Sequence, residues 1–318
     1  MAWRPLGLFY ALPVPPYDPC RLTLCRLLCF ACEIGLARPC ILSRARTNHP
    51  ASSGGRATGD TMTKIISFAN QKGGVGKSTI CLQTVFHLQE AGFRVLAIDL
   101  DPQGNTSSRL SQQEGEYTGT PSAFLFREDY TDIRPMRCAR GMDLIWTEKN
   151  DPELSEIESM PLNCVLNPIN NLKASGILEH YDYVAVDCPP SLGRKLVAAL
   201  TMSTHVICPV QVSGFALDGV EGLLNTIINV QEELNPDLEN TGMVINNLNR
   251  NFPSHLRACE QLREAVPDLV YTAEIGLRGK LDEANNLGVP VWSIKTTSAR
   301  DAAKDIRAVI NELMEKVG

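Results

Sequence analysis

A glycine-rich run with two lysines and two hydroxyl residues is the part of this sequence with the clearest potential for chemistry. It reads Lys72-Gly-Gly-Val-Gly-Lys-Ser-Thr79 and matches a phosphate-binding loop, in which backbone N–H groups surround the phosphates of a nucleotide. In such a loop the lysine before the hydroxyl residues reaches the β- and γ-phosphates, so we assign that role to Lys77. Ser78 is the expected Mg²⁺ ligand. The remaining nucleotide contacts are expected from Gly73, Gly74, Val75, Gly76 and Thr79.

This loop departs from the usual pattern at its first position. The usual pattern begins with a glycine that four residues separate from the Gly-Lys-Ser/Thr end. Here Gln71 stands at that position and Lys72 follows it. Lys72 has no role in binding phosphate within one chain. A second ammonium group at the mouth of the loop makes chemical sense if it neutralises charge on phosphates bound by a neighbouring subunit.

Three carboxylates follow apolar runs that are typical of buried strands. Asp187 comes after residues 181–186 and fits the acidic residue that orients Mg²⁺ through its water shell. Asp99 and Asp101 are two residues apart, so they share one face of an extended strand. We assign Asp101 to the attacking water and Asp99 to support of the metal region. Taken alone, each carboxylate could equally be a helix N-cap or an ion-pair partner.

The sequence favours an adenine base over a guanine base. Guanine selection usually relies on an Asn-Lys-x-Asp run, whose carboxylate accepts hydrogen bonds from the two donors of the base. The nearest stretch, Asn246-Asn-Leu-Asn249, lacks both the lysine and the aspartate. We therefore expect ATP as the nucleotide. Candidate walls of the base pocket are Asn246 and the segment Pro209-Val-Gln211.

Apolar strand-like runs alternate with stretches of helical periodicity along most of the chain. We expect strands at residues 64–69, 94–99, 142–146, 181–187, 205–210, 242–246 and 269–273. We expect helices at residues 79–90, 123–126, 162–180, 192–202, 217–234, 254–266 and 299–316, and a helix or loop at 151–160. This order predicts an α/β fold with one doubly wound, mostly parallel sheet, which binds its ligand at the carboxyl ends of the strands.

The first 61 residues differ in composition from the rest of the chain. Of the 318 residues, positions 1–61 hold seven Arg, no Lys and three acids, a net charge of +4. Residues 62–318 hold 23 basic and 33 acidic residues, a net charge of −10. The chain therefore divides into an N-terminal extension, residues 1–61, and a nucleotide-binding domain, residues 62–318.

Three interpretations of the extension compete. A secretory signal would need an uninterrupted apolar core, but Arg26 and Glu33 interrupt the apolar stretch. A zinc site could use Cys29 and Cys32, but no second pair of ligands completes it. We favour a disordered extension or a translated upstream stretch, with Met62 as a natural start. The six cysteines after residue 62 lack paired spacing, which favours buried thiols in a reducing cytoplasm.

Three motifs together resemble the ParA family of plasmid and chromosome partition ATPases. They are Lys72-Gly-Gly-Val-Gly-Lys-Ser-Thr79, Asp99-Leu-Asp-Pro-Gln-Gly-Asn105 and Asp187-Cys-Pro-Pro190. The tail at residues 275–292 is similar to the IncC-like branch of that family. The resemblance covers residues 62–318. It implies a P-loop ATPase of the ParA/MinD class that hydrolyses ATP with Mg²⁺ as an ATP-bound homodimer, in which Lys72 reaches the partner's nucleotide.

The same resemblance implies macromolecular partners. The ATP-bound dimer of this family binds double-stranded DNA without sequence preference, and a ParB-type centromere-binding protein stimulates hydrolysis and release. The resemblance therefore also implies that this protein is cytoplasmic and associated with the nucleoid. Longer relatives carry an N-terminal helix-turn-helix that represses their own operon. Residues 1–61 show no such pattern, so the sequence does not decide whether this chain regulates an operon.

DNA binding needs a local basic surface, because a net charge of −10 repels phosphate at long range. Basic residues within the last 41 positions are candidates, and Lys280 stands where the family has a DNA-contacting arginine. Our candidate DNA contacts are Arg278, Lys280, Lys295 and Arg300, with Lys304 and Arg307 nearby. Without the resemblance, these charges would fit a solvated helix face. Two such surfaces in one dimer would roughly double the phosphates engaged.

The main alternative is a MinD-like ATPase that controls membrane attachment or positioning. That class needs a basic amphipathic C-terminal helix. Residues 301–318 instead hold four acids and three bases, with apolar residues on one side, so we expect this helix to pack against the domain. An iron–sulfur carrier would need a cysteine at the dimer face, and a tyrosine autokinase a tyrosine-rich tail, whereas the last tyrosine is Tyr271.

Overall fold

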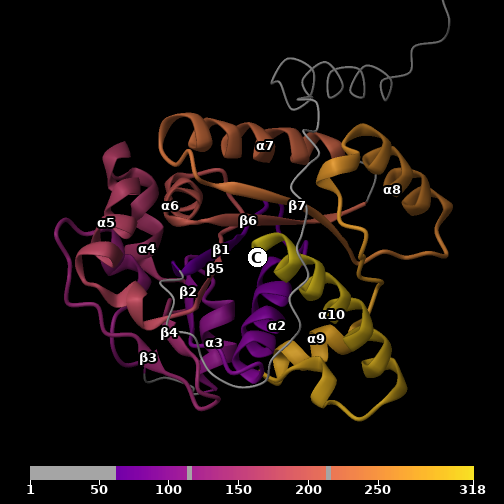
Figure 1. Cartoon of the computed structure of the whole chain (residues 1–318), viewed down its shortest axis with the longest axis horizontal. Coiled ribbons are helices and arrows are strands. Elements are labelled where there is room, and N and C mark those ends of the chain that lie inside the picture. The colour runs from indigo at the N-terminus through magenta and orange to yellow at the C-terminus, as the bar shows by residue number, and fades with distance from the viewer. Residues whose placement is uncertain (1–61, 113–116, 213–215) are drawn as a thin grey trace, which may run out of the picture. The chain divides into compact units, whose positions relative to one another are not determined.

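The computed structural model describes residues 62–112, 117–212 and 216–318, and within them one sheet of seven strands carries helices on both faces (Figure 1). The strand order is β3-β4-β2-β5-β1-β6-β7. Neighbouring strands are parallel except for the antiparallel pair β3 and β4. The strands are β1 (Lys64–Phe68), β2 (Val95–Asp99), β3 (Met136–Arg137), β4 (Asp143–Ile145), β5 (Tyr183–Asp187), β6 (His205–Gln211) and β7 (Glu239–Asn246). The expected doubly wound, mostly parallel α/β fold is confirmed.

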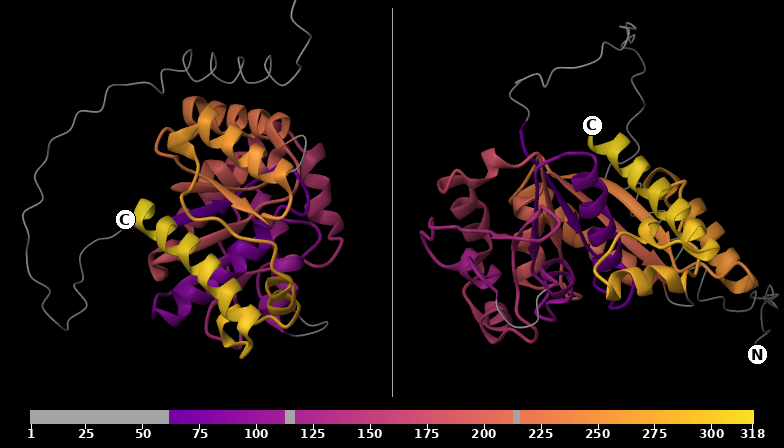
Figure 2. Two further views of the ribbon diagram at one scale, coloured as in Figure 1. Left: turned by 90° about the vertical axis from the view of Figure 1, so that its right-hand side faces the viewer. Right: turned by 90° about the horizontal axis from the view of Figure 1, so that it is seen from below.

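Two sets of helices cover the two faces of this sheet. One face carries α2 (Lys77–Glu90), α3 (Asn105–Ser111), α9 (Gly279–Asn286) and α10 (Thr297–Val317). The other face carries α4 (Pro152–Glu156), α5 (Asn167–Ala174), α6 (Arg194–Met202), α7 (Ala216–Glu233) and α8 (Pro253–Ala265). Figure 2 shows the C-terminal α10 beside α2, the helix that follows the phosphate-binding loop. Short 3₁₀ helices are η1 (Ser122–Phe126), η2 (Ile157–Ser159), η3 (Leu162–Leu166), η4 (Ile177–His180), η5 (Pro267–Leu269) and η6 (Val291–Ser293).

The central strands are mostly apolar because both of their faces are buried. Successive side chains alternate between two cores: Ile65 packs with the α6 side, whereas Ile66 packs with the α2 side. Gly92 ends α2 as expected, since its φ of 87° is a left-handed conformation that a glycine adopts without strain. The chain then enters β2, which is fully buried.

Strand order decides which carboxyl ends meet. β5 lies between β1 and β2, and in the register of these strands Asp187 is paired with Phe68 on one side and with Asp99 on the other. The loop after β1 and the carboxylates that end β2 and β5 therefore lie at one edge of the sheet.

Two sequence expectations were wrong in detail. Residues 162–180 form η3, α5 and η4 rather than one helix, because Gly176 adopts a left-handed φ of 68° after α5. Residues 269–273 are not a strand. They lie beside β7, with one isolated bridge between Met243 and Val270 and a 2.8 Å bond from the Tyr271 N–H to the Met243 carbonyl. Helix α9 was not expected from periodicity.

Helix α10 packs against the domain, as expected. Its apolar residues Ile306, Val309, Ile310, Leu313 and Val317 are all buried in the core on the α2 side. None of the helices in the described residues combines the length and the apolar character that a membrane crossing requires. The six cysteines after residue 62 are free and buried, as predicted. The interpretations of residues 1–61 concern positions outside the described residues.

Candidate nucleotide site

The phosphate-binding loop connects β1 to α2 and is shaped by two glycines in left-handed conformations. Gly74 has a φ of 74° and Gly76 a φ of 97°, which side chains of L-residues rarely adopt. Three side chains bond to the backbone of the loop. Asn70 Oδ1 accepts a 2.8 Å bond from the Lys72 N–H. Gln211 Nε2 donates a 3.0 Å bond to the Gly74 carbonyl, and Asn246 Nδ2 donates a 2.8 Å bond to the Val75 carbonyl. These three bonds fix the course of the loop backbone.

Lys77 is directed into this loop rather than into solvent. Only 6% of Lys77 is exposed, and its Nζ donates a 3.2 Å hydrogen bond to the carbonyl of Lys72. Burial lowers the pKa of Lys77, while the charges of Asp187, Cys188 and Asp101 oppose that effect. Bound phosphate would supply the negative charge that this buried ammonium group lacks.

Asp187 is the buried carboxylate nearest to the loop. Its exposure is 0%, its Oδ2 accepts a 2.6 Å bond from the Thr106 hydroxyl, and its Oδ1 has no hydrogen-bond partner. Burial raises the pKa of Asp187 to about 6, although the hydroxyls of Ser78 and Thr106 lower it. The Ser78 hydroxyl thus lies near this carboxylate, but no bond of normal geometry joins it to Oδ1.

An unpartnered oxygen at this position fits a Mg²⁺ ligand. A buried carboxylate oxygen without a donor is costly unless a cation or a proton compensates it. Among the described residues no group of three His, Cys, Asp or Glu side chains could hold a metal ion. Mg²⁺ usually needs no such cage, because one or two protein oxygens, waters and phosphates complete its octahedron. Ser78 and Asp187 match that pattern.

Asp99 is engaged by protein donors on both oxygens. Oδ2 accepts 2.8 Å bonds from the N–H and the hydroxyl of Ser107, and Oδ1 accepts a 3.1 Å bond from the N–H of Asp101. Burial raises the pKa of Asp99 well above its usual value, and the charge of Asp187 adds to that rise. These contacts let Asp99 support the metal region by fixing the neighbouring loop and α3. Its place among the metal-site residues stays a prediction.

Asp101 begins the turn that leads from β2 into α3. It is 7% exposed, and its Oδ1 accepts a 3.0 Å bond from the N–H of Gln103. Its carbonyl accepts a 2.9 Å bond from the N–H of Gly104. Its role in positioning the attacking water stays a prediction.

Several residues of this site were not found from the sequence. Thr106 and Ser107 bind the two central carboxylates from the first turn of α3, and Asn70 supports the loop. Outside the site itself, Asn285 of α9 donates a 2.7 Å bond to the hydroxyl of Thr79. The run of hydroxyl residues after Gly104 was the one available signal, because donors near a strand end often bind the carboxylates of that edge.

The two candidate walls of the base pocket lie close to the loop. Asn246 is 3% exposed, and Pro209 is buried and accepts a 2.6 Å bond from Asn70 Nδ2 through its carbonyl. A Cβ placed on Gly76 would lie 2.0 Å from Asn246 Nδ2, so only glycine fits there. Both residues therefore support the loop, and their contact with a base stays a prediction.

The candidate DNA contacts divide into two groups. Arg278 forms a 2.9 Å ion pair with Asp305, and Lys280 is paired with Glu283. Lys295 and Arg300 are exposed.

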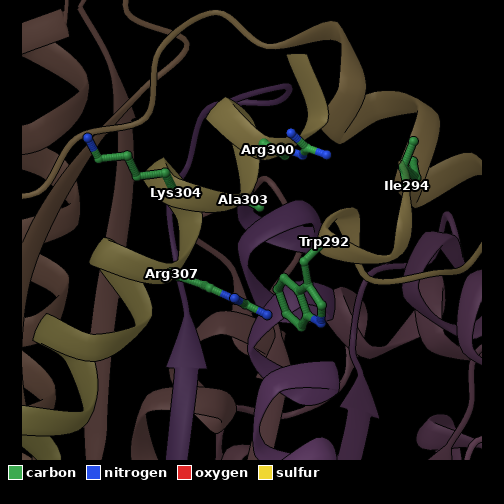
Figure 3. A pocket seen from close by; sticks show the side chains of 6 residues that line it. All are labelled: Trp292, Ile294, Arg300, Ala303, Lys304 and Arg307. Atoms are coloured by element: carbon green, nitrogen blue, oxygen red, sulfur yellow. The ribbon is translucent and has the colours of Figure 1, made fainter. Parts of the chain in front are cut away.

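Arg300 belongs to a distinct groove at the start of α10. The groove has a volume of about 330 Å³, and we call it the basic groove; it is lined by Trp292, Ile294, Arg300, Ala303, Lys304 and Arg307. Figure 3 shows Arg307 pointing toward the indole of Trp292, and its Cζ lies 4.8 Å from the ring centroid. Three cations from successive turns of α10 thus line this groove, and among them Arg307 lies over the Trp292 ring.

Comparison with known proteins gives one family profile and many relatives. A profile described as an AAA domain matches residues 63–240. The protein IncC of Escherichia coli is 33% identical over 265 residues, covering 82% of this chain and 71% of that protein. The sporulation initiation inhibitor protein Soj of Bacillus subtilis is 34% identical over 257 residues, covering 78% of this chain and 99% of Soj. The chromosome partitioning protein ParA of Caulobacter vibrioides is 34% identical over 260 residues, covering 78% of this chain and 94% of that protein.

Solved structures with the same fold include nucleotide complexes. Cobyrinic acid a,c-diamide synthase from Mycobacterium smegmatis with bound ADP and magnesium has a TM-score of 0.63 and 27% identity, covering 80% of this chain and 97% of that chain. A plasmid partition protein from Borrelia burgdorferi B31 bound to AMPPNP has a TM-score of 0.62 and 23% identity, covering 80% and 99%. At the lower identity, the second likeness bears on the fold alone.

Proposed function

Since the chain belongs to the ParA family of partition ATPases, we propose that it binds ATP with Mg²⁺ at the loop after β1, hydrolyses it to ADP and phosphate, and uses that cycle to segregate DNA. The observation that carries the proposal is the unpartnered Oδ1 of the fully buried Asp187, beside Ser78 and Lys77. A buried anion of this kind next to an anion-binding loop is expected where a cation joins a nucleotide to the protein.

Each residue of the site then has a definite task. The N–H groups of residues 73–79 and the ammonium group of Lys77 bind the phosphates, and Ser78 with Asp187 would hold the metal ion. When bound, Mg²⁺ neutralises negative charge on the phosphates as the bond to the leaving group breaks. Asp101 orients the attacking water in line with that bond, and Asp99 holds the N–H of Asp101 in place.

Two cationic features, Lys72 and the basic groove, support a dimer that binds DNA. Lys72 is exposed at the mouth of the loop, where it can reach the phosphates of a partner's nucleotide. The basic groove carries three further cations on α10. We propose that ATP-bound homodimers align two such grooves on double-stranded DNA, without sequence preference, and that a ParB-type centromere-binding protein stimulates hydrolysis and release. The protein would then be cytoplasmic and associated with the nucleoid.

A sedimentation experiment separates this function from membrane attachment, the alternative proposed for a MinD-like ATPase. The protein is mixed with nonspecific double-stranded DNA or with vesicles of anionic lipid, each with and without ATP and Mg²⁺. We expect ATP-dependent sedimentation with DNA and none with vesicles. Sedimentation with vesicles instead of DNA would refute the partition function, and the absence of ATP turnover would refute the enzyme.

A further inference from the structure

A polar stripe runs along α2 on the side that faces the C-terminal part of the chain. Thr79, Gln83, His87 and Glu90 are spaced by four, four and three residues, so they lie on one face of the helix. Each of them contacts residues 285–292, which run from the end of α9 into η6. We call these residues the coupling segment. A helix face that packs on a neighbouring segment is usually apolar, and this one is not.

The contacts of the stripe are specific hydrogen bonds. Asn285 Nδ2 donates 2.7 Å to Thr79 Oγ1, one residue after the expected metal ligand Ser78. Gln83 is 0% exposed. Its Nε2 donates 3.3 Å bonds to Asn285 Oδ1 and to the Val289 carbonyl. Its Oε1 accepts a 2.9 Å bond from the Val291 N–H. A buried amide with all of these partners fixes the position of the segment on α2.

The far end of the coupling segment is Trp292. Its indole Nε1 donates a 2.7 Å bond to Glu90 Oε2, and its ring meets the His87 ring edge-on at a centroid distance of 6.2 Å. Trp292 also lines the basic groove and carries the Arg307 guanidinium on its ring (Figure 3). The stripe therefore links the first turn of the loop helix to the basic groove.

Helix α3 holds the same segment from a second side. Thr106 donates to Asp187, and one turn later Arg109 Nη2 donates a 3.1 Å bond to Asn286 Oδ1. Gln112 Nε2 donates 2.8 Å to the Gly288 carbonyl, and a Cβ on Gly288 would lie 2.4 Å from the carbonyl of Arg109. Helices α2 and α3, which both contact the coupling segment, thus begin at groups of the nucleotide site.

From this arrangement we propose that the coupling segment transmits the state of the nucleotide site to the basic groove, with Asn285 and Asn286 as its two sensing residues. The inference rests on the proposed function, because it assigns a regulatory role to that site. When phosphate and a cation bind at Ser78 and Asp187, the first turns of α2 and α3 adjust. Asn285 and Asn286 follow those two turns, and the segment carries the adjustment to Trp292. Coupling of this kind is reciprocal, so DNA in the groove would also change ATP affinity.

Trp292 provides a readout that does not depend on DNA. The chain holds three tryptophans, Trp3, Trp146 and Trp292. In the full-length chain with Trp3→Phe and Trp146→Phe, the emission of Trp292 is recorded during titration with ATP and Mg²⁺. Binding is measured separately with a fluorescent ATP analogue. We expect a saturable change of Trp292 emission whose midpoint equals the dissociation constant of ATP.

The test variants are Asn285→Ala and Asn286→Ala in that background, with Asn311→Ala as the matched control on the exposed side of α10. We expect each test variant to bind ATP within threefold of the parent, to lose most of the Trp292 response, and to lower ATP-dependent DNA retention about tenfold. Asn311→Ala should behave as the parent does. Thermal unfolding of every variant shows whether it is folded.

The outcomes separate the coupling from the function on which it rests. If the parent binds ATP and Trp292 does not respond, or if both test variants keep the full response, the coupling segment is refuted and the ATPase proposal stands. If a folded test variant loses ATP binding itself, that residue belongs to the nucleotide site and its sensing role is refuted. If the parent does not bind ATP, the proposed function fails first.

Discussion

The side-chain amide of Asn246 lies directly beneath the phosphate-binding loop, and its Nδ2 donates a 2.8 Å hydrogen bond to the carbonyl of Val75. Asn246 ends β7, whereas the loop follows β1, and β6 separates the two strands. The bond therefore connects an outer strand of the sheet to the loop. Since Gly76 leaves no room for a Cβ beside this amide, the loop and Asn246 form one packed unit.

Replacing Asn246 by alanine tests whether this residue supports the loop or contacts the base. Loss of the buried bond should lower the free energy of unfolding by about 1 kcal/mol and loosen the loop. If the role is support alone, affinities for ATP and GTP should fall by the same factor, about five- to tenfold. A change in the ATP:GTP ratio would show that Asn246 is a wall of the base pocket. Nucleotide titration and denaturant unfolding measure both effects, and Asn251→Ala, at an exposed position, is the control.

Asp187→Asn should stabilise the nucleotide-free protein while removing its response to Mg²⁺. The carboxylate is fully buried with one oxygen unpartnered, and burial raises its pKa from 3.8 to about 6. At pH 7 a shift of that size corresponds to a cost of about 3 kcal/mol in the folded state, which a neutral amide avoids. Denaturant unfolding without nucleotide should show the gain, and ATP turnover should be lost.

The control for this variant is Asp132→Asn, which changes a carboxylate in an exposed pair with Arg134 and should leave stability unchanged. A decrease in stability for Asp187→Asn, with Asp132→Asn unchanged, would mean that the charge of Asp187 is compensated within the protein. The argument for a metal ligand would then lose its basis.

The pH dependence of stability should include a contribution from His87. This imidazole faces Glu90 of its own helix and Arg307 of α10, and burial followed by the charge of Arg307 lowers its pKa below 6.5. The unfolded chain therefore binds a proton at higher pH than the folded chain does. Stability is unaffected above about pH 6.5 and is lost as the pH falls through that value toward the folded pKa.

His87→Gln isolates the contribution of His87 to the pH dependence of stability, because glutamine does not titrate. The difference in the free energy of unfolding between wild type and variant should be constant above pH 7. Between pH 6.5 and 5.5 the wild type should lose stability relative to the variant. Denaturant unfolding at five pH values in this range measures it. A difference that is flat with pH would show that the pKa of His87 is the same in the folded and the unfolded chain.

The positions of the strand ends along the chain were predictable, but the side chains that bind the residues there were not. The β-branched run before the glycine-rich motif predicted β1, the loop and α2. The acidic residues that follow two further apolar runs predicted the ends of β2 and β5. Gln83 gave no such signal, because a buried glutamine in a helix follows no apolar period. Its partners at Val289 and Val291 come from a segment 206 and 208 residues away, and only the fold brings them together. The bond from Thr106 to Asp187 has the same character.

Lys72→Ala tests the second lysine of the loop. The Lys72 side chain is exposed, and its N–H and its carbonyl both form hydrogen bonds within the loop. We expect ATP affinity to stay within about threefold, while ATP-dependent dimerisation and DNA retention are lost. Sedimentation velocity with a slowly hydrolysed ATP analogue measures the dimer. A variant that still dimerises and sediments with DNA would remove Lys72 from any contact with the partner's nucleotide.

The salt dependence of DNA binding should distinguish the two groups of basic residues near the C-terminus. Each phosphate neutralised contributes about 0.9 to the slope of log affinity against log salt. Arg300 lines the basic groove, so Arg300→Ala should lower the slope of an ATP-bound dimer by about 2, one contact for each protomer. Lys280 is paired with Glu283, and Lys280→Ala should change the slope less. Lys173→Ala, on α5 at the opposite face of the sheet, should leave it unchanged. Titrations at four salt concentrations decide the matter, because an effect of Lys280→Ala equal to that of Arg300→Ala would place the DNA on α9 rather than on the groove.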